Sequence, residues 1–139
     1  FTPEQAWLAA KAGAKYVSPF AGRVDDDLRK STGVEFEKTD YYPADGEEVR
    51  GKVVEDNGVV SGIDLCEQIR VLFDNYKFKT QILAASLRNS RQIREAALSG
   101  ADVATIPFGA LVSTISHHKT KEGMEAFMKD TVKEYRDVF

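Results

Sequence analysis

The chain has 139 residues, of which 42% are hydrophobic and 29% charged, and its formal net charge at pH 7 is −3. This length suits one domain with an apolar core, and the composition excludes a disordered tail. Because the charge is nearly balanced and no apolar run approaches the ~20 residues of a membrane span, we expect neither a nucleic-acid nor a membrane partner.

The chain opens with the signals of a helix. Thr2 is placed to cap it, and Pro3 suits the first helical position. Gln5 completes a capping box, and Gly13 ends the pattern. The stretch "AKYVSPF" that follows has the composition of a strand. Residues 94–108, "REAALSGADVATIPF", repeat this order of helix, glycine, alanine, strand, proline and phenylalanine, so we expect two copies of one αβ step.

Residues 27–60 break this rhythm because they are charged and punctuated by glycine. Within them, "VEFEKTDYY" and "VRGKVV" alternate like short strands on either side of the turn sequence "PADGEE". We therefore expect an inserted β-hairpin at the position of a βα loop. Two interpretations stay open for it, a solvated loop or a lid or interface arm.

Beyond the insertion, apolar side chains recur at the spacing of a buried helix face. They are Ile63, Cys66, Ile69, Leu72, Phe73 and Tyr76. The next stretch, "TQILAAS", is a continuous apolar run typical of a strand buried on both faces, so the strands are expected to be parallel. The single Cys66 has no partner for an internal disulfide, which predicts a core thiol in a reducing, cytoplasmic compartment.

The last segment, "KEGMEAFMKDTVKEYRDVF", has one apolar stripe at helical spacing, which is typical of a core or subunit contact. The stripe comprises Met124, Phe127, Met128, Thr131, Tyr135 and Val138. His117 and His118 precede it without a carboxylate or cysteine at ligand spacing, so we expect no metal site.

Three βα steps with parallel strands fit either a doubly wound sheet or part of a (β/α)8 barrel, and no dinucleotide or P-loop glycine motif favours the former. In a barrel the chemistry lies at the carboxyl ends of the strands, which here read "SPFAGR", "AASLRN" and "IPFGAL". The side chains placed at this rim are Ser18, Arg23, Ser86 and Arg88. Guanidinium forks, hydroxyls and the free N–H groups of a helix start suit an oxyanion of charge near −2. The alternative for each arginine is an ion pair with Asp25 or Asp26.

Three blocks in this order, "AGAKYVSPFAGRVDD", "TQILAASLRNSRQI" and "GADVATIPF", resemble the transaldolase family, including its small transaldolase-like and fructose-6-phosphate aldolase group. The resemblance implies a (β/α)8 barrel that uses no cofactor. Its members form a Schiff base between a lysine and a ketose phosphate and then transfer a dihydroxyacetone unit. Position by position, Arg23, Ser86 and Arg88 match residues that hold the phosphate, and Ser18 is a weaker match.

By this resemblance, "SPF", "AAS" and "IPF" mark the sixth to eighth strands, whereas the Schiff-base lysine lies on the fourth. Lys15 and Lys79 stand at the beginnings of their strands, which is the opposite rim. We therefore expect residues 1–139 to be the C-terminal part of a single barrel domain, inactive alone, with the lysine upstream. Three strands of eight leave open edges, which predicts a homo-oligomer.

Two positions near the rim bear on the reaction. The aldolase subgroup typically carries tyrosine where this chain has Phe20, and it tends to carry lysine where this chain has Arg88. Both differences favour transfer to an aldose acceptor. Three alternatives stay open: a fructose-6-phosphate aldolase, a sulfosugar in place of the sugar phosphate, and a non-catalytic half-barrel that binds sugar phosphates.

Overall fold

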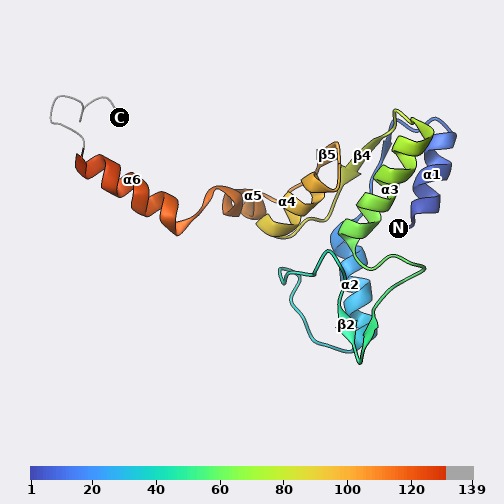
Figure 1. Cartoon of the computed structure of the whole chain (residues 1–139), viewed down its shortest axis with the longest axis horizontal. Coiled ribbons are helices and arrows are strands. Elements are labelled where there is room, and N and C mark those ends of the chain that lie inside the picture. Colours follow the sequence, from blue (N-terminus) through green and yellow to red (C-terminus); the bar gives the residue numbers. More distant parts are fainter. Residues whose placement is uncertain (131–139) are drawn as a thin grey trace.

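The computed structural model of the chain describes residues 1–130, which form a mixed α/β arrangement (Figure 1). In chain order its elements are α1 (Pro3–Lys11), β1 (Tyr16–Val17), α2 (Ala21–Thr32), β2 (Glu48–Val49), β3 (Lys52–Val53), α3 (Gly62–Tyr76), β4 (Gln81–Ala84), α4 (Ser90–Leu98), β5 (Val103–Ala104), α5 (Phe108–Ile115) and α6 (His118–Asp130).

The sheet confirms the expected parallel strands. Its order is β1-β4-β5, with Tyr16 paired to Gln81 and Leu83 paired to Val103, and both pairings are parallel. Within residues 1–130, β1 and β5 each pair on one side only. The carboxyl ends of the strands therefore meet at one edge, and both outer strands have an open side.

The predicted capping of α1 is confirmed. The Gln5 backbone N–H donates to the Thr2 hydroxyl at 3.2 Å, and the Thr2 N–H donates to the Gln5 side chain at 3.3 Å. The helix buries Ala6 and Ala10 and packs against α3, as Figure 1 shows. These small side chains let the two helices approach closely.

The α3 helix forms the centre of the core, and the predicted apolar stripe is largely confirmed. Its buried residues include Ile63, Leu65, Cys66, Ile69 and Phe73. Tyr76 was wrongly placed in the core, because it is 52% exposed and stacks on Phe78 at 5.6 Å. Burial raises the pKa of the Cys66 thiol to about 12, which keeps it protonated and agrees with the predicted core role.

The predicted hairpin is present but lies elsewhere. Residues 34–42 form no strand, and the antiparallel pair is β2 with β3. Its turn is at Arg50 and Gly51, whose φ angles of 53° and 76° are the positive values that a type I′ turn needs. The helix α2 also continues to Thr32, so residues 27–32 are helical rather than looped.

The C-terminal helices extend away from the rest of the chain in Figure 1. In the described part of α6 no residue is buried, so the predicted stripe makes no core there. Met124, Phe127 and Met128 are 56–76% exposed, and a subunit contact stays a prediction for them. The other stripe positions, Thr131, Tyr135 and Val138, lie outside the described residues. Among residues 1–130 no helix is long and apolar enough to cross a membrane.

Candidate functional site

The segments that follow β1 and β4 meet directly, and we call residues 18–23 and 85–89 together the rim. Phe20 and Ala85 form a parallel bridge, and the Ala85 N–H donates to the Pro19 carbonyl at 2.9 Å. The helix α2 begins at Ala21, immediately after this bridge. Two of the three sequence blocks predicted to converge are therefore in contact.

Gly22 allows this close approach. A Cβ atom at Gly22 would overlap the Ser86 carbonyl oxygen and would lie 2.8 Å from Arg88 Nε. Ser86 itself has a φ of 64°, a left-handed conformation that is uncommon for a serine. The glycine of "SPFAGR" thus serves the packing of α2 against the segment after β4.

Arg88 is held by protein acceptors on every side. Its guanidinium donates to both carboxylate oxygens of Asp26, at 2.7 and 3.2 Å, and to the Gly22 carbonyl at 3.2 Å. Further acceptors are the carbonyl and hydroxyl of Ser86, both at 3.3 Å, and the Lys38 carbonyl at 3.1 Å. Because a guanidinium has five N–H donors, all of them are engaged. Of the two interpretations weighed for Arg88, the ion pair with Asp26 is therefore present.

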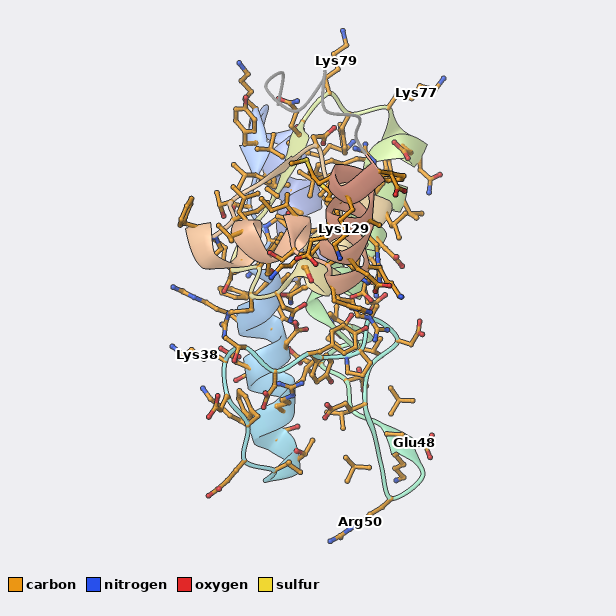
Figure 2. All side chains as sticks on the ribbon, turned by 90° about the vertical axis from the view of Figure 1, so that its left-hand side faces the viewer. Lys38, Glu48, Arg50, Lys77, Lys79 and Lys129 are labelled. Atoms are coloured by element: carbon orange, nitrogen blue, oxygen red, sulfur yellow. The ribbon has the colours of Figure 1, made fainter. Side chains whose placement is uncertain are left out.

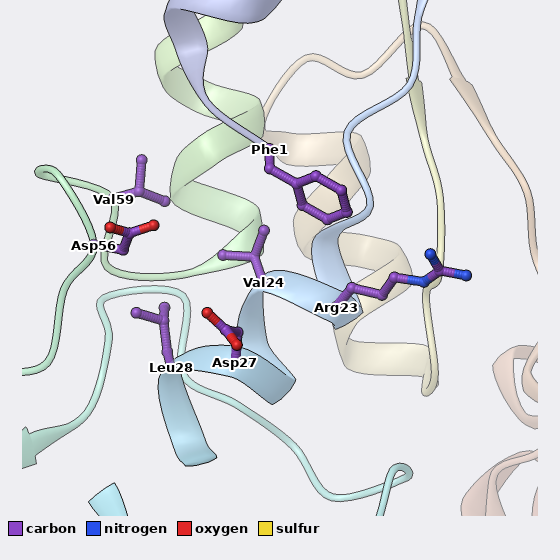
Figure 3. A pocket seen from close by; sticks show the side chains of 7 residues that line it. All are labelled: Phe1, Arg23, Val24, Asp27, Leu28, Asp56 and Val59. Atoms are coloured by element: carbon purple, nitrogen blue, oxygen red, sulfur yellow. The ribbon is translucent and has the colours of Figure 1, made fainter. Parts of the chain in front are cut away.

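Arg23 is the accessible cation of the rim. It is exposed on the first turn of α2 and stacks over the Phe20 ring, with 4.7 Å between guanidinium carbon and ring centre. Within residues 1–130 its guanidinium makes no hydrogen bond or ion pair. Arg23 lines a pocket together with Val24 and Leu28, and Figure 3 shows its guanidinium directed away from these two side chains. Arg23 is free to contact a ligand.

The structure separates Ser18 from the other predicted residues. Ser18 is exposed and lines a different pocket, between α1 and β1, together with Thr2 and Tyr16. Its hydroxyl makes no hydrogen bond within the described residues. The structure thus brings Ser86 and Arg88 together, places Arg23 next to Gly22, and leaves Ser18 apart.

Sequence reasoning missed a buried polar network beneath the rim. Asp25, only 5% exposed, accepts hydrogen bonds from the Gly62 N–H and from Gln92 Nε2, both at 2.7 Å. Gln92 Oε1 in turn accepts the Arg88 N–H at 2.8 Å. Asn89 caps α4 by accepting the Gln92 N–H at 2.9 Å. The spacing Asn-x-x-Gln, typical of a capping box, was the available signal for this contact.

The Asp25 carboxyl has an unusual protonation equilibrium. Burial raises its pKa from the ordinary 3.8 to about 7, although the Gly62 N–H and the Arg29 guanidinium favour the charged form. The network therefore changes charge near neutral pH.

The remaining predicted parts of the site are at the start of α5 and at the two histidines. The helix α5 begins at Phe108 after Pro107, without a side-chain cap. His117 and His118 stack on each other with ring centres 4.5 Å apart. No group of three or more His, Cys, Asp or Glu within residues 1–130 is arranged to hold a metal ion.

Comparisons with known proteins agree with the resemblance seen in the sequence. The family model described as "Transaldolase/Fructose-6-phosphate aldolase" matches residues 1–138. The chain belongs to this family.

A protein of Bartonella bacilliformis named "Probable transaldolase" is 43% identical over 133 residues, which cover 96% of this chain and 47% of the relative. One of Caulobacter vibrioides with the same name is 42% identical over 130 residues, or 94% of this chain and 46% of the relative. The chain thus spans a little under half the length of these relatives.

The first prediction for this transaldolase-family chain concerns the close approach of Gly22 to the Ser86 carbonyl oxygen. Gly22→Ala should lower the free energy of unfolding by about 3 kcal/mol, because the new methyl group overlaps a backbone oxygen that cannot move independently. Urea denaturation measures the change. Gly123→Ala is the matched control: its Cβ meets open space on α6, so helix propensity should make it neutral or stabilising by up to ~1 kcal/mol. Equal stability of Gly22→Ala and the wild type would contradict the described packing.

The second prediction concerns pH. Between pH 3.8 and about 7 the folded chain keeps the Asp25 proton that the unfolded chain releases. Protonation of Asp25 therefore stabilises the folded chain at low pH, and this stabilisation is lost as the pH rises through that range. Asp25→Asn removes the titration but leaves the other groups. The difference in unfolding free energy, wild type minus Asp25→Asn, should therefore decrease between pH 4 and pH 7, by at most ~1.4 kcal/mol per pH unit. A difference that is constant across this range in urea titrations would refute the raised pKa.

Proposed function

We propose that this chain forms the C-terminal portion of a (β/α)8 barrel of transaldolase type and supplies its phosphate-binding rim. Three features support the barrel. The strands β1, β4 and β5 are parallel and neighbour one another in chain order, each is followed by a helix, and both outer strands have open edges. In a barrel, further strands pair with such edges.

The observation that carries the proposed function is the junction of Ser86, Arg88 and the first turn of α2 at the carboxyl ends of the strands. Arg23 presents a free guanidinium next to this junction. Arg88 fixes Ser86, and because its guanidinium is paired with both oxygens of Asp26, it would need to exchange one of its present acceptors to contact the ligand. In this proposal, Arg23 and the Ser86 hydroxyl bind the phosphate of a ketose phosphate directly.

The reaction proposed for the whole enzyme is the transfer of a dihydroxyacetone unit between sugar phosphates through a Schiff base. None of the lysines in residues 1–130 suits this role, because every one of them is exposed. A Schiff-base amine has to lose its proton, which burial promotes. In Figure 2, Lys79 lies at the top of the molecule, well away from Lys38, whose carbonyl contacts Arg88. The phenyl ring of Phe20 carries no hydroxyl for proton transfer. Its absence favours passing the dihydroxyacetone unit to an aldose acceptor over releasing it as free dihydroxyacetone.

The third prediction tests the phosphate-binding residues in an enzyme with both halves. We would join the chain to the N-terminal half of the Bartonella bacilliformis relative and assay ketose donors with and without phosphate. Arg23→Ala should raise the KM of the phosphorylated donor about 10-fold to 100-fold, because a charge-assisted hydrogen bond contributes about 1.5–3 kcal/mol. Arg23→Lys should recover part of this loss, since an ammonium keeps the charge but not the planar fork.

Arg88→Ala should likewise raise the KM of the phosphorylated donor more than that of the donor without phosphate. It should also lower the stability of the protein, because the ion pair with Asp26 is lost. The donor without phosphate is the internal control. Equal losses for both donors would show that the arginines only support the rim. A donor with a sulfonate head group reports whether the site distinguishes the two anions.

The fourth prediction concerns the nucleophile. Borohydride treatment of the 139-residue chain alone with a ketose phosphate should trap no sugar adduct, whereas the joined enzyme should be modified on its N-terminal half. Mass spectrometry reads both results. A stable adduct on any lysine of this chain would contradict the proposed division of the site.

A further inference from the structure

Residues 34–47, which we call the strap, connect α2 to β2 and are tied to α2 by a buried arginine. Arg29 is 7% exposed and donates to the carbonyls of Asp40 and Tyr41. Its guanidinium also lies 5.2 Å from the ring centres of Phe36 and Tyr42, which come from the strap. The middle of the strap, residues 36–42, is therefore fixed to α2 through backbone and ring contacts.

The strap is also docked on α4 through Tyr41. The Tyr41 hydroxyl donates to Glu95 Oε1 at 2.8 Å, and Arg91 stacks over the Tyr41 ring at 3.8 Å. Arg91 and Glu95 form an ion pair at 3.0 Å, which holds both partners of the tyrosine. The strap thus spans from α2 to α4, on the two sides of the rim.

Next to these attachments the strap contacts the rim itself. The Lys38 carbonyl accepts a hydrogen bond from Arg88 Nη1 at 3.1 Å, and the Thr39 carbonyl accepts one from Asn89 Nδ2 at 3.5 Å. Lys38 and Thr39 lie within three residues of Tyr41, so the docking of Tyr41 limits their movement. These contacts favour a defined role over a solvated loop.

We propose that the strap positions Arg88 at the rim, and that Tyr41, docked on Glu95, is the positioning residue that holds the strap in place. The inference rests on the proposed anion site, to which Arg88 contributes its charge. Asp26 fixes one side of the Arg88 guanidinium and the Lys38 carbonyl fixes another. Loss of the Tyr41 hydroxyl removes the bond to Glu95 and loosens the second contact, although Arg29 still holds the strap backbone; the first contact does not depend on the strap.

The experiment uses the 139-residue chain with 15N-labelled arginine. Nuclear magnetic resonance measures the solvent exchange of the Arg88 guanidinium protons, and Arg88→Lys identifies their signals. Titration with inorganic phosphate on the same samples measures anion affinity. Tyr41→Phe should speed the Arg88 exchange several-fold and weaken phosphate binding several-fold, because it removes the hydroxyl that bonds Glu95 and the Ala44 N–H and so loosens the strap, while the change in side-chain volume is small.

Two further variants separate positioning from general stability. Glu95→Gln keeps an acceptor oxygen for the Tyr41 hydroxyl and should stay near the wild type in both measurements. Tyr16→Phe is the matched control, since this half-exposed tyrosine lies at the start of β1 and its hydroxyl makes no hydrogen bond within residues 1–130.

Unchanged Arg88 exchange in Tyr41→Phe would overturn the inference, whatever happens to stability or phosphate affinity. Unchanged phosphate affinity in a chain that binds phosphate would also overturn it. If the wild type binds no inorganic phosphate while Tyr41→Phe still speeds the Arg88 exchange, the proposed anion site fails and the positioning role of the strap stands.

Discussion

The buried carboxylate of Asp25 is the constraint on which the arrangement of the rim depends. It joins three helices, because it lies on α2, accepts the first N–H of α3 from Gly62, and accepts the Gln92 side chain from α4. Burying a carboxyl is costly unless its oxygens are hydrogen-bonded, so both N–H donors are needed for it to stay there. The helices can come this close because a side chain at Gly62 would overlap the backbone of Ala21. Once these helices are fixed, the segment after β4 can take only a narrow range of positions.

Three arginines on or beside α2 have different roles. Arg29 is buried and ties the strap to the helix, and Arg88 crosses from the neighbouring segment to pair with Asp26 on the same helix. Arg23 is left exposed and stacks on the Phe20 ring. The chemistry of the three side chains is identical, so their different roles come from where each lies relative to α2. The inward face of α2 makes contacts within the protein, whereas its first turn exposes the guanidinium of Arg23 to solvent.

Much of the fold could be predicted because its signals are local in sequence. The capping box at Thr2, the helical apolar spacing in α3 and the apolar run of β4 each needed only a short window. The strand predicted from the alternating pattern in residues 34–42 is absent, and Arg29 binds the carbonyls of Asp40 and Tyr41, which a strand would use for pairing. For the site, the meeting of Ser86 and Arg88 with α2 followed from the strand ends. The pairing of Asp25 with Gln92 did not, because these residues lie on α2 and α4, and the strand ends alone do not show which faces of the two helices meet.

The chain contains two kinds of surface, and their contrast bears on how a barrel could be completed. The polar network of α2, α3 and α4 is formed within the chain, so Ser86 and Arg88 are brought together without any further element, and only an exchange of one Arg88 acceptor would remain for anion binding. The outer strand β5 and the helix α5 are different, since Val103 is 38% and Phe108 81% exposed. Apolar surface of this kind usually marks a contact with other protein. In the proposed barrel, neighbouring strands and helices would cover it. Closure would then add the nucleophile and bury these apolar side chains, while the hydrogen bonds that orient Arg88 and Ser86 would already be in place.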